Sequence, residues 1–260
     1  MVEEQHDHIC WGGGHHHHGG HTLTIEQLSA HYGAHKALDN IQLSAHCGQT
    51  LALIGPNGAG KSTLINLLAG LMRPVSGQIL WNGAPLHETR HEIAFMPQRS
   101  EVDRNFPITV LELVEMGRYP STGLWKPMRR HDRDIVDKAL TALDLQDLQN
   151  RQIGALSGGQ QQRAFLARAL AQEAHILLLD EPFTGLDVPG TESLASLLRT
   201  LAAEGRLVIA SHHDLNTAAQ IFDFTLLLNR SAIAYGPTAS VLTAENLHTA
   251  FGQRTITTTP

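Results

Sequence analysis

One eight-residue stretch constrains the fold more than any other part of the chain: Gly55-Pro-Asn-Gly-Ala-Gly-Lys61-Ser62. It has the spacing of a P-loop and lies between an apolar run from Thr50 to Gly55 and a helical pattern from Lys61 to Leu71. Glycines here allow consecutive backbone N–H groups to face an anion, and the start of a helix adds its dipole. The stretch therefore predicts a strand, a phosphate-binding loop and a helix, with the loop formed by Gly55, Pro56, Asn57, Gly58, Ala59, Gly60, Lys61, Ser62 and Thr63.

The last residues of this loop indicate a nucleoside triphosphate with magnesium. Lys61 can reach the β- and γ-phosphates, and the Ser62 hydroxyl can ligate Mg²⁺. The alternative is a glycine-rich turn that matches the pattern by chance, and the strand-loop-helix context argues against it. We expect a nucleoside triphosphate and Mg²⁺ as the ligands of this loop, and a P-loop alone leaves kinases, GTPases and helicases open.

A second polar site follows the apolar run Ile176-Leu-Leu-Leu, which ends in Asp180 and Glu181. A buried strand has no structural need for two carboxylates at its end, because unpaired buried charge is costly. We predict that Asp180 helps to hold Mg²⁺ and that Glu181 polarises the attacking water. The alternative is a pair of acids that merely cap a following helix.

A second anion-binding turn lies about 95 residues after the first, in Leu156, Ser157, Gly158, Gly159 and Gln160, at the start of a predicted helix. One nucleotide does not need two phosphate-binding turns from one chain. Two chains packed head to tail do, if each second turn closes on the nucleotide of the other chain. Read as a plain serine N-cap, the stretch would need only Ser157 and no Gly-Gly-Gln.

The composition of the 260 residues fits a folded α/β protein. Hydrophobic residues make up 42%, and the net charge of −6 predicts no basic face for nucleic acid. Two cysteines do not make a disulfide framework, and no apolar run reaches the length of a membrane span. Strand-like patterns alternate with helical ones after residue 22, and about 99–170 is mainly helical.

These motifs together resemble an ABC transporter nucleotide-binding subunit, over residues 22 to about 252. The resemblance implies a P-loop (RecA-like) core with an antiparallel β subdomain and an inserted α-helical signature subdomain at about 99–170. The domain would then span 22–260, preceded by a flexible arm at 1–21. It also implies ATP hydrolysis as the activity.

Further landmarks of that family occur in order. Tyr32 resembles the aromatic residue that stacks on adenine, and Gln98 resembles the glutamine that contacts Mg²⁺ and the water. The segment Thr184-Gly-Leu-Asp187 resembles the loop that contacts the other subunit. His213 resembles the switch histidine at the γ-phosphate, because it directly precedes Asp214, whereas His212 does not. The implied catalytic residues are Glu181, His213, Lys61 and Gln98.

The resemblance also implies partners: a second copy in a head-to-tail dimer, an integral membrane permease and, indirectly, a substrate-binding protein. The subunit would be peripheral, on the cytoplasmic face of the inner membrane. The segments 106–110, Met116-Gly-Arg-Tyr-Pro120 and Phe183-Thr-Gly185 are similar to importers of manganese, zinc and iron, with zinc expected first. An importer of siderophores, haem or cobalamin is the alternative, followed by a soluble ABC ATPase that acts on ribosomes or DNA.

The first 21 residues differ from the rest, since they hold seven of the 17 histidines in a glycine-rich context. Such a composition predicts a flexible arm rather than a packed element. Imidazole and thiol groups suit Zn²⁺, so we expect metal binding here. A functionless tail and a purification remnant remain the alternatives. The candidate ligands are His6, His8, Cys10, His15, His16, His17, His18 and His21.

Overall fold

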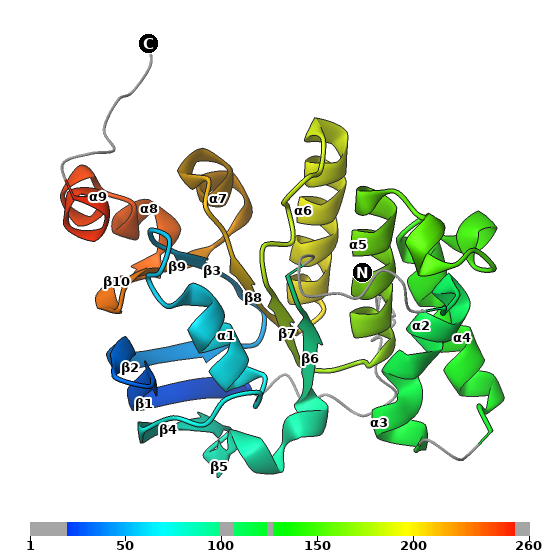
Figure 1. Ribbon diagram of the computed structural model, residues 1–260, viewed down its shortest axis with the longest axis horizontal. Coiled ribbons are helices and arrows are strands. Elements are labelled where there is room, and N and C mark those ends of the chain that lie inside the picture. Colours follow the sequence, from blue (N-terminus) through cyan, green and yellow to red (C-terminus); the bar gives the residue numbers. More distant parts are fainter. Residues whose placement is uncertain (1–19, 99–106, 124–126, 253–260) are drawn as a thin grey trace, which may run out of the picture.

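The structure, a computed structural model, describes residues 20–98, 107–123 and 127–252, and its centre is a mainly parallel sheet (Figure 1). The strand order is β10-β9-β3-β8-β7-β6, with β10 antiparallel at the edge and the other neighbours parallel. The strands are β3 (Thr50–Ile54), β6 (Ile93–Met96), β7 (Ile176–Leu179), β8 (Leu207–Ser211), β9 (Phe224–Asn229) and β10 (Ser231–Pro237).

The central strands β3, β7 and β8 are buried at every position because both faces of the sheet are covered. Alternate residues of β3 enter two different apolar clusters: Leu51 and Leu53 join one, and Ala52 and Ile54 join the other. Helix α1 (Lys61–Leu68) packs in the first cluster. Helices α5 (Gly158–Ala171) and α6 (Val188–Ala203) pack in the second. The P-loop helix and the helix of the second glycine turn therefore cover opposite faces of the sheet.

A separate antiparallel sheet, in the order β2-β1-β4-β5, packs beyond α1 (Figure 1). Its strands are β1 (Thr22–Tyr32), β2 (His35–His46), β4 (Ser76–Trp81) and β5 (Ala84–Pro85). In β1 the buried residues Leu23 and Ile25 alternate with more exposed ones, as the sequence pattern indicated. This sheet and the parallel sheet confirm the predicted core and antiparallel β subdomain.

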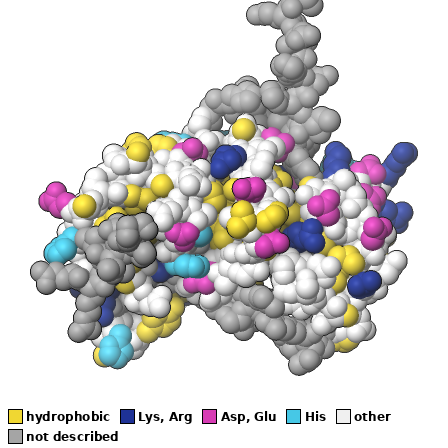
Figure 2. Space-filling view, turned by 90° about the horizontal axis from the view of Figure 1, so that it is seen from above, with side chains coloured by type: hydrophobic (Ala, Val, Ile, Leu, Met, Phe, Trp, Pro, Cys, Tyr) yellow, Lys and Arg dark blue, Asp and Glu magenta, His cyan; other side chains and the backbone are white. Residues whose placement is uncertain are grey.

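A mainly helical segment follows β6. Its α-helices are α2 (Val110–Glu115), α3 (Tyr119–Thr122), α4 (Arg130–Ala142) and α5, and its 3-10 helices are η4 (Met116–Arg118), η5 (Gln146–Leu148) and η6 (Ile153–Ala155). Thr109 and Glu112 form a capping box that begins α2. On the face shown in Figure 2, basic and acidic side chains intermix at the end of the molecule that holds this segment. Residues 99–106 and 124–126 lie outside the described ranges.

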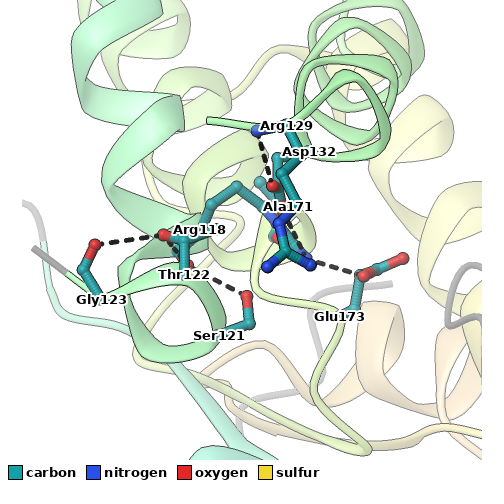
Figure 3. A network of polar contacts seen from close by, with 8 residues as sticks. All are labelled: Arg118, Ser121, Thr122, Gly123, Arg129, Asp132, Ala171 and Glu173. Atoms are coloured by element: carbon teal, nitrogen blue, oxygen red, sulfur yellow. Dashed lines mark hydrogen bonds and ion pairs between the residues drawn. The ribbon is translucent and has the colours of Figure 1, made fainter. Parts of the chain in front are cut away.

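Arg118 joins three parts of this helical segment (Figure 3). Its guanidinium is buried, lies 3.1 Å from Asp132 of α4, and is 2.8 Å from both the Ala171 carbonyl and the Glu173 carboxylate. The preceding residue must be glycine, because a Cβ at Gly117 would lie 2.3 Å from the Arg168 carbonyl oxygen. Packing within the subunit thus explains why Gly117 and Arg118 occur in the segment 116–120, whatever substrate is transported.

The remaining α-helices follow β8, and the 3-10 helices that precede β6 follow β5. They are α7 (Leu215–Ile221), α8 (Thr238–Val241) and α9 (Ala244–Phe251), with 3-10 helices η1 (Leu86–Glu88) and η2 (Arg90–Glu92) near β5. In the described ranges, no helix combines the length and the apolar character that crossing a membrane requires.

Helix α1 is shorter than the pattern to Leu71 predicted. It ends at Leu68 because Gly70 adopts a left-handed backbone with φ 71°. The amides of Gly70 and Leu71 then bond the carbonyls of Leu67 and Asn66, which closes the helix. The apolar residues that follow belong to this closing turn.

Candidate functional site

The P-loop connects β3 to α1, and its backbone leaves no room for side chains at two glycines. A Cβ at Gly55 would lie 2.1 Å from the Leu228 carbonyl oxygen. At Gly60 the backbone has φ 101°, and a Cβ would meet Leu38 at 2.4 Å. Gly58 also has a positive φ, of 77°. These positions require glycine, so the loop adopts the tightly wound form that the motif predicted.

The start of α1 fits a phosphate group. Its N-cap is Gly60, and within the described part of the chain no side chain caps it, whereas Ser157 and Asp187 cap α5 and α6. The amides of its first turn are thus left for an anion. Lys61 folds over the same loop, and its Nζ donates to the carbonyls of Gly55 at 2.7 Å and Pro56 at 3.1 Å.

Two carboxylates follow β7, as predicted, and they lie in the electrostatic field of Lys61. Burial lowers the pKa of the Lys61 ammonium, and the charges of Glu181 and Asp180 oppose that shift. Asp180 is buried at 4% exposure, and its amide donates to the Met96 carbonyl at the end of β6. An ammonium, two carboxylates and a phosphate-binding turn therefore share one edge of the sheet.

Ser211, at the end of β8, holds both carboxylate residues in place. Its hydroxyl donates to Asp180 Oδ1 at 2.5 Å and accepts from the Glu181 amide at 2.8 Å. Glu181 adopts φ 50°, a left-handed conformation that costs a non-glycine residue free energy. The hydrogen bond from its amide to Ser211 helps to retain that conformation. Sequence reasoning missed Ser211, although the pairing of Leu179 with Ala210 places it beside Asp180.

Gln98 and Thr184 both reach the Glu181 side chain. The Gln98 amide nitrogen lies 3.0 Å from Glu181 Oε2, and the Thr184 hydroxyl donates to the same oxygen at 3.2 Å. The structure thus brings together Gln98 and Glu181, which the sequence placed 83 residues apart. Ser62, at the start of α1, is exposed, and Thr63 is buried in the helix.

The two neighbouring histidines after β8 have opposite environments. His212 is buried at 3% exposure, and its ring centroid lies 5.2 Å from Phe183 and 6.1 Å from Phe222. Burial lowers its pKa to about 4, the charge of His213 adds to this, and the charges of Asp214 and Glu181 oppose it. His213 is exposed and can therefore reach a ligand, which the buried His212 cannot. Its role at the γ-phosphate stays a prediction.

The second glycine turn begins α5, and its details correct one step of the sequence reasoning. Ser157 Oγ accepts from the Gln160 amide at 3.4 Å, and Gln160 Oε1 accepts from the Ser157 amide at 2.9 Å. Gln160 is therefore part of an ordinary capping box, and a serine cap does account for it. The capping box does not explain why residues 158 and 159 are both glycine. Leu156 is buried, whereas Ser157 is exposed.

Two more predicted contact residues lie on the surface. Tyr32 ends β1 with 53% of its surface exposed, which leaves its ring available for stacking. Asp187 begins α6, and its Oδ1 accepts from the Gly190 amide at 3.0 Å. Both positions fit the roles that the family resemblance implied, and both roles stay predictions.

Most of the predicted zinc ligands, from His6 to His18, lie outside the described residues. His21 lies inside them, and its carbonyl accepts from the Cys47 amide at 2.9 Å. Its ring packs against Trp81 and His175, with centroids at 5.6 and 5.0 Å. His21 thus connects the histidine-rich stretch to the folded core.

Comparisons with known proteins identify the family. The ABC transporter family model matches residues 38–184, more than half of the chain. The chain is 44% identical to the manganese transport system ATP-binding protein MntB of Bacillus subtilis, over 89% of this chain and 93% of that protein. It is 42% identical to MntB of Halalkalibacterium halodurans, over 86% and 89% of the two chains.

Solved structures show the same fold. A metal-chelate type ABC transporter in an inward-facing conformation matches with a TM-score of 0.78 and 35% identity, over 89% of this chain and 88% of that one. A dimeric ABC transporter cassette, MJ0796, matches with a TM-score of 0.73 and 26% identity, over 83% and 98%. The phosphate-binding turn, the paired carboxylates and these similarities agree, and the chain belongs to the ABC transporter family as an ATP-binding subunit and ATPase.

Proposed function

We propose that this chain energises the import of a divalent transition-metal ion through a membrane permease. The observation that carries the proposal is the extent of similarity to subunits named for manganese transport, combined with a complete set of P-loop and carboxylate residues. The subunit would work at the cytoplasmic face of the membrane. A substrate-binding protein would deliver the metal on the other side.

Lys61 and the first-turn amides of α1 would hold the phosphate oxygens of ATP. Ser62, Asp180 and Gln98 are the residues that would hold Mg²⁺, which neutralises phosphate charge when it is bound. Glu181 would orient and deprotonate the attacking water, since its carboxylate is held by Gln98 and Thr184. His213 would contact the γ-phosphate from the end of β8.

The functional unit would be a head-to-tail dimer. The P-loop helix and α5 cover opposite faces of the parallel sheet, which keeps the Ser157 turn and the P-loop of one chain on separate sides. A second copy would bring its Ser157 turn to the first copy's nucleotide. The dimeric cassette among the structural relatives supports this assembly. Asp187 would lie where the two copies meet.

The identity of the metal depends on two separate observations. The names of the relatives favour manganese. The histidine-rich N-terminal stretch favours zinc, because imidazole suits Zn²⁺ better than Mn²⁺. A metal chelate is the second candidate cargo, favoured by the similarity to a metal-chelate type transporter.

The experiment is cellular metal analysis in a strain that lacks this chain. Cells that carry the parental chain or Glu181→Gln would be grown under manganese limitation and, separately, under zinc limitation. We expect the parental chain, and not the variant, to restore the cellular content of one of these metals. Restoration of neither metal, with restored uptake of a metal chelate, would contradict the proposal and support the second candidate.

A further inference from the structure

The hairpin that joins β1 to β2 places a second polar ring beside Tyr32. Tyr32 and His35 are cross-strand partners on either side of the turn at Gly33 and Ala34. Directly opposed residues of an antiparallel pair project from the same face of the sheet. Both side chains are exposed. The tip of this hairpin therefore presents a phenol and an imidazole on one face.

The face that carries both rings is the face that packs on the P-loop. Ala30 and Tyr32 are alternate residues of β1 and share a face, and the cross-strand partner of Ala30 is Leu38. Ala30 and Leu38 are both buried. Leu38 lies against the P-loop, since a Cβ at Gly60 would lie 2.4 Å from the Leu38 side chain. Tyr32 and His35 thus continue this face beyond the residues that contact the loop.

Of the two strands, β2 is the one that is tied to the P-loop. The Asp39 amide of β2 donates to the Arg230 carbonyl at 2.7 Å, and the Arg230 amide donates to the Ala59 carbonyl of the loop at 2.9 Å. The sheet order β2-β1-β4-β5 makes β2 the edge strand, with β1 behind it at the usual spacing of about 4.8 Å. His35 therefore belongs to the strand next to the P-loop, and Tyr32 belongs to the strand behind it.

The parts of a nucleotide follow the same order, because the ribose joins the phosphates to the base. With phosphates on the P-loop and adenine on Tyr32, the ribose would lie over β2, where His35 is exposed. An imidazole nitrogen can donate to a ribose hydroxyl or accept from it, according to its tautomer. We propose that His35 is a further nucleotide-binding residue that hydrogen-bonds a ribose hydroxyl. The inference rests on the predicted contact of Tyr32 with adenine, and not on which metal is transported.

ADP and its 2′-deoxy and 3′-deoxy forms test this contact, because they bind without being hydrolysed. Calorimetry would measure their dissociation constants for the parental chain and for His35→Ala. We expect the variant to bind ADP about threefold to tenfold more weakly, as the loss of one hydrogen bond predicts. The parent should discriminate against one deoxy form by a similar factor, and the variant should bind that form as tightly as it binds ADP. His31→Ala, on the opposite face of the same hairpin, is the matched control and should bind all three like the parent.

Parental ADP affinity in His35→Ala would overturn the proposal. Equal losses for ADP and both deoxy forms would overturn it too, since the lost contact would then not involve the ribose. Inorganic tripolyphosphate should bind the variant like the parent, and weaker binding would place the effect on the P-loop instead. Tyr32→Ala tests the base contact separately. Unchanged ADP affinity in Tyr32→Ala, together with the expected result for His35→Ala, would refute stacking on Tyr32 and support the ribose contact.

Discussion

Ser211→Ala removes a hydroxyl that holds the two acidic residues of the ATP site. The side chain is fully buried, donates to Asp180 Oδ1 at 2.5 Å and accepts from the Glu181 amide at 2.8 Å. A hydrogen bond to a charged group contributes about 1.5–3 kcal/mol, and a neutral one about 1 kcal/mol. We therefore expect the free energy of unfolding to fall by about 2–4 kcal/mol.

The same substitution should slow hydrolysis more than it weakens ATP binding. Glu181 keeps its left-handed backbone partly through Ser211, whereas Lys61 is held by the carbonyls of Gly55 and Pro56 in the P-loop. We expect kcat to fall about 10- to 100-fold with KM changed less than about threefold. Urea unfolding and steady-state phosphate release would measure the two effects.

Ser196→Ala, on the exposed side of α6, is the matched control and should change neither quantity. Parental stability together with a parental rate in Ser211→Ala would refute the assigned role of the hydroxyl. A loss of stability with an unchanged kcat would show that Ser211 supports the fold without positioning Glu181.

Three further substitutions test other parts of the account. Gly117→Ala should lower the free energy of unfolding by about 1–3 kcal/mol in thermal or urea unfolding, because its Cβ would lie 2.3 Å from the Arg168 carbonyl. The pKa of His212 in the folded protein is lowered to about 4. The neutral ring therefore contributes fully to the free energy of unfolding above about pH 6.5, and this contribution is lost as the pH falls toward 4. His212→Leu should remove this acid sensitivity, on the order of 2 kcal/mol after solvent screening, when unfolding is compared at pH 7 and pH 4.5. Glu181→Gln should bind ATP and hydrolyse it at least about 100-fold more slowly, whereas Lys61→Ala should weaken binding itself in a nucleotide titration.

Sequence reasoning predicted those site residues whose type is required by nucleotide chemistry and is not explained by the packing of the strand or helix that holds them. The P-loop glycines are one example, since the structure shows that side chains at Gly55 and Gly60 would collide with Leu228 and Leu38. The acidic pair after β7 is another, because a buried strand end does not need it. In both cases the chemistry leaves few alternative residues.

Residues that act through tertiary contacts could not be predicted in this way. A serine at the end of an apolar strand is common, and only the pairing of β7 with β8 shows that Ser211 meets Asp180. The burial of Arg118 between Asp132 and Glu173 depends on the packing of α4 against the end of α5. The sequence reasoning also overlooked that Gln160 completes a capping box with Ser157.

The central claim is that each ATP is hydrolysed between two copies of the chain, by the P-loop of one and the Ser157 turn of the other. The most direct measurement mixes Ser157→Arg chains with Lys61→Ala chains, each of which alone has both sites damaged. Random mixing should restore about a quarter of the parental sites, since half of the dimers are heterodimers and each has one intact site. ATPase activity that appears on mixing, and rises with total protein concentration, is the predicted result. Parental hydrolysis by Ser157→Arg alone, independent of protein concentration, would contradict the claim.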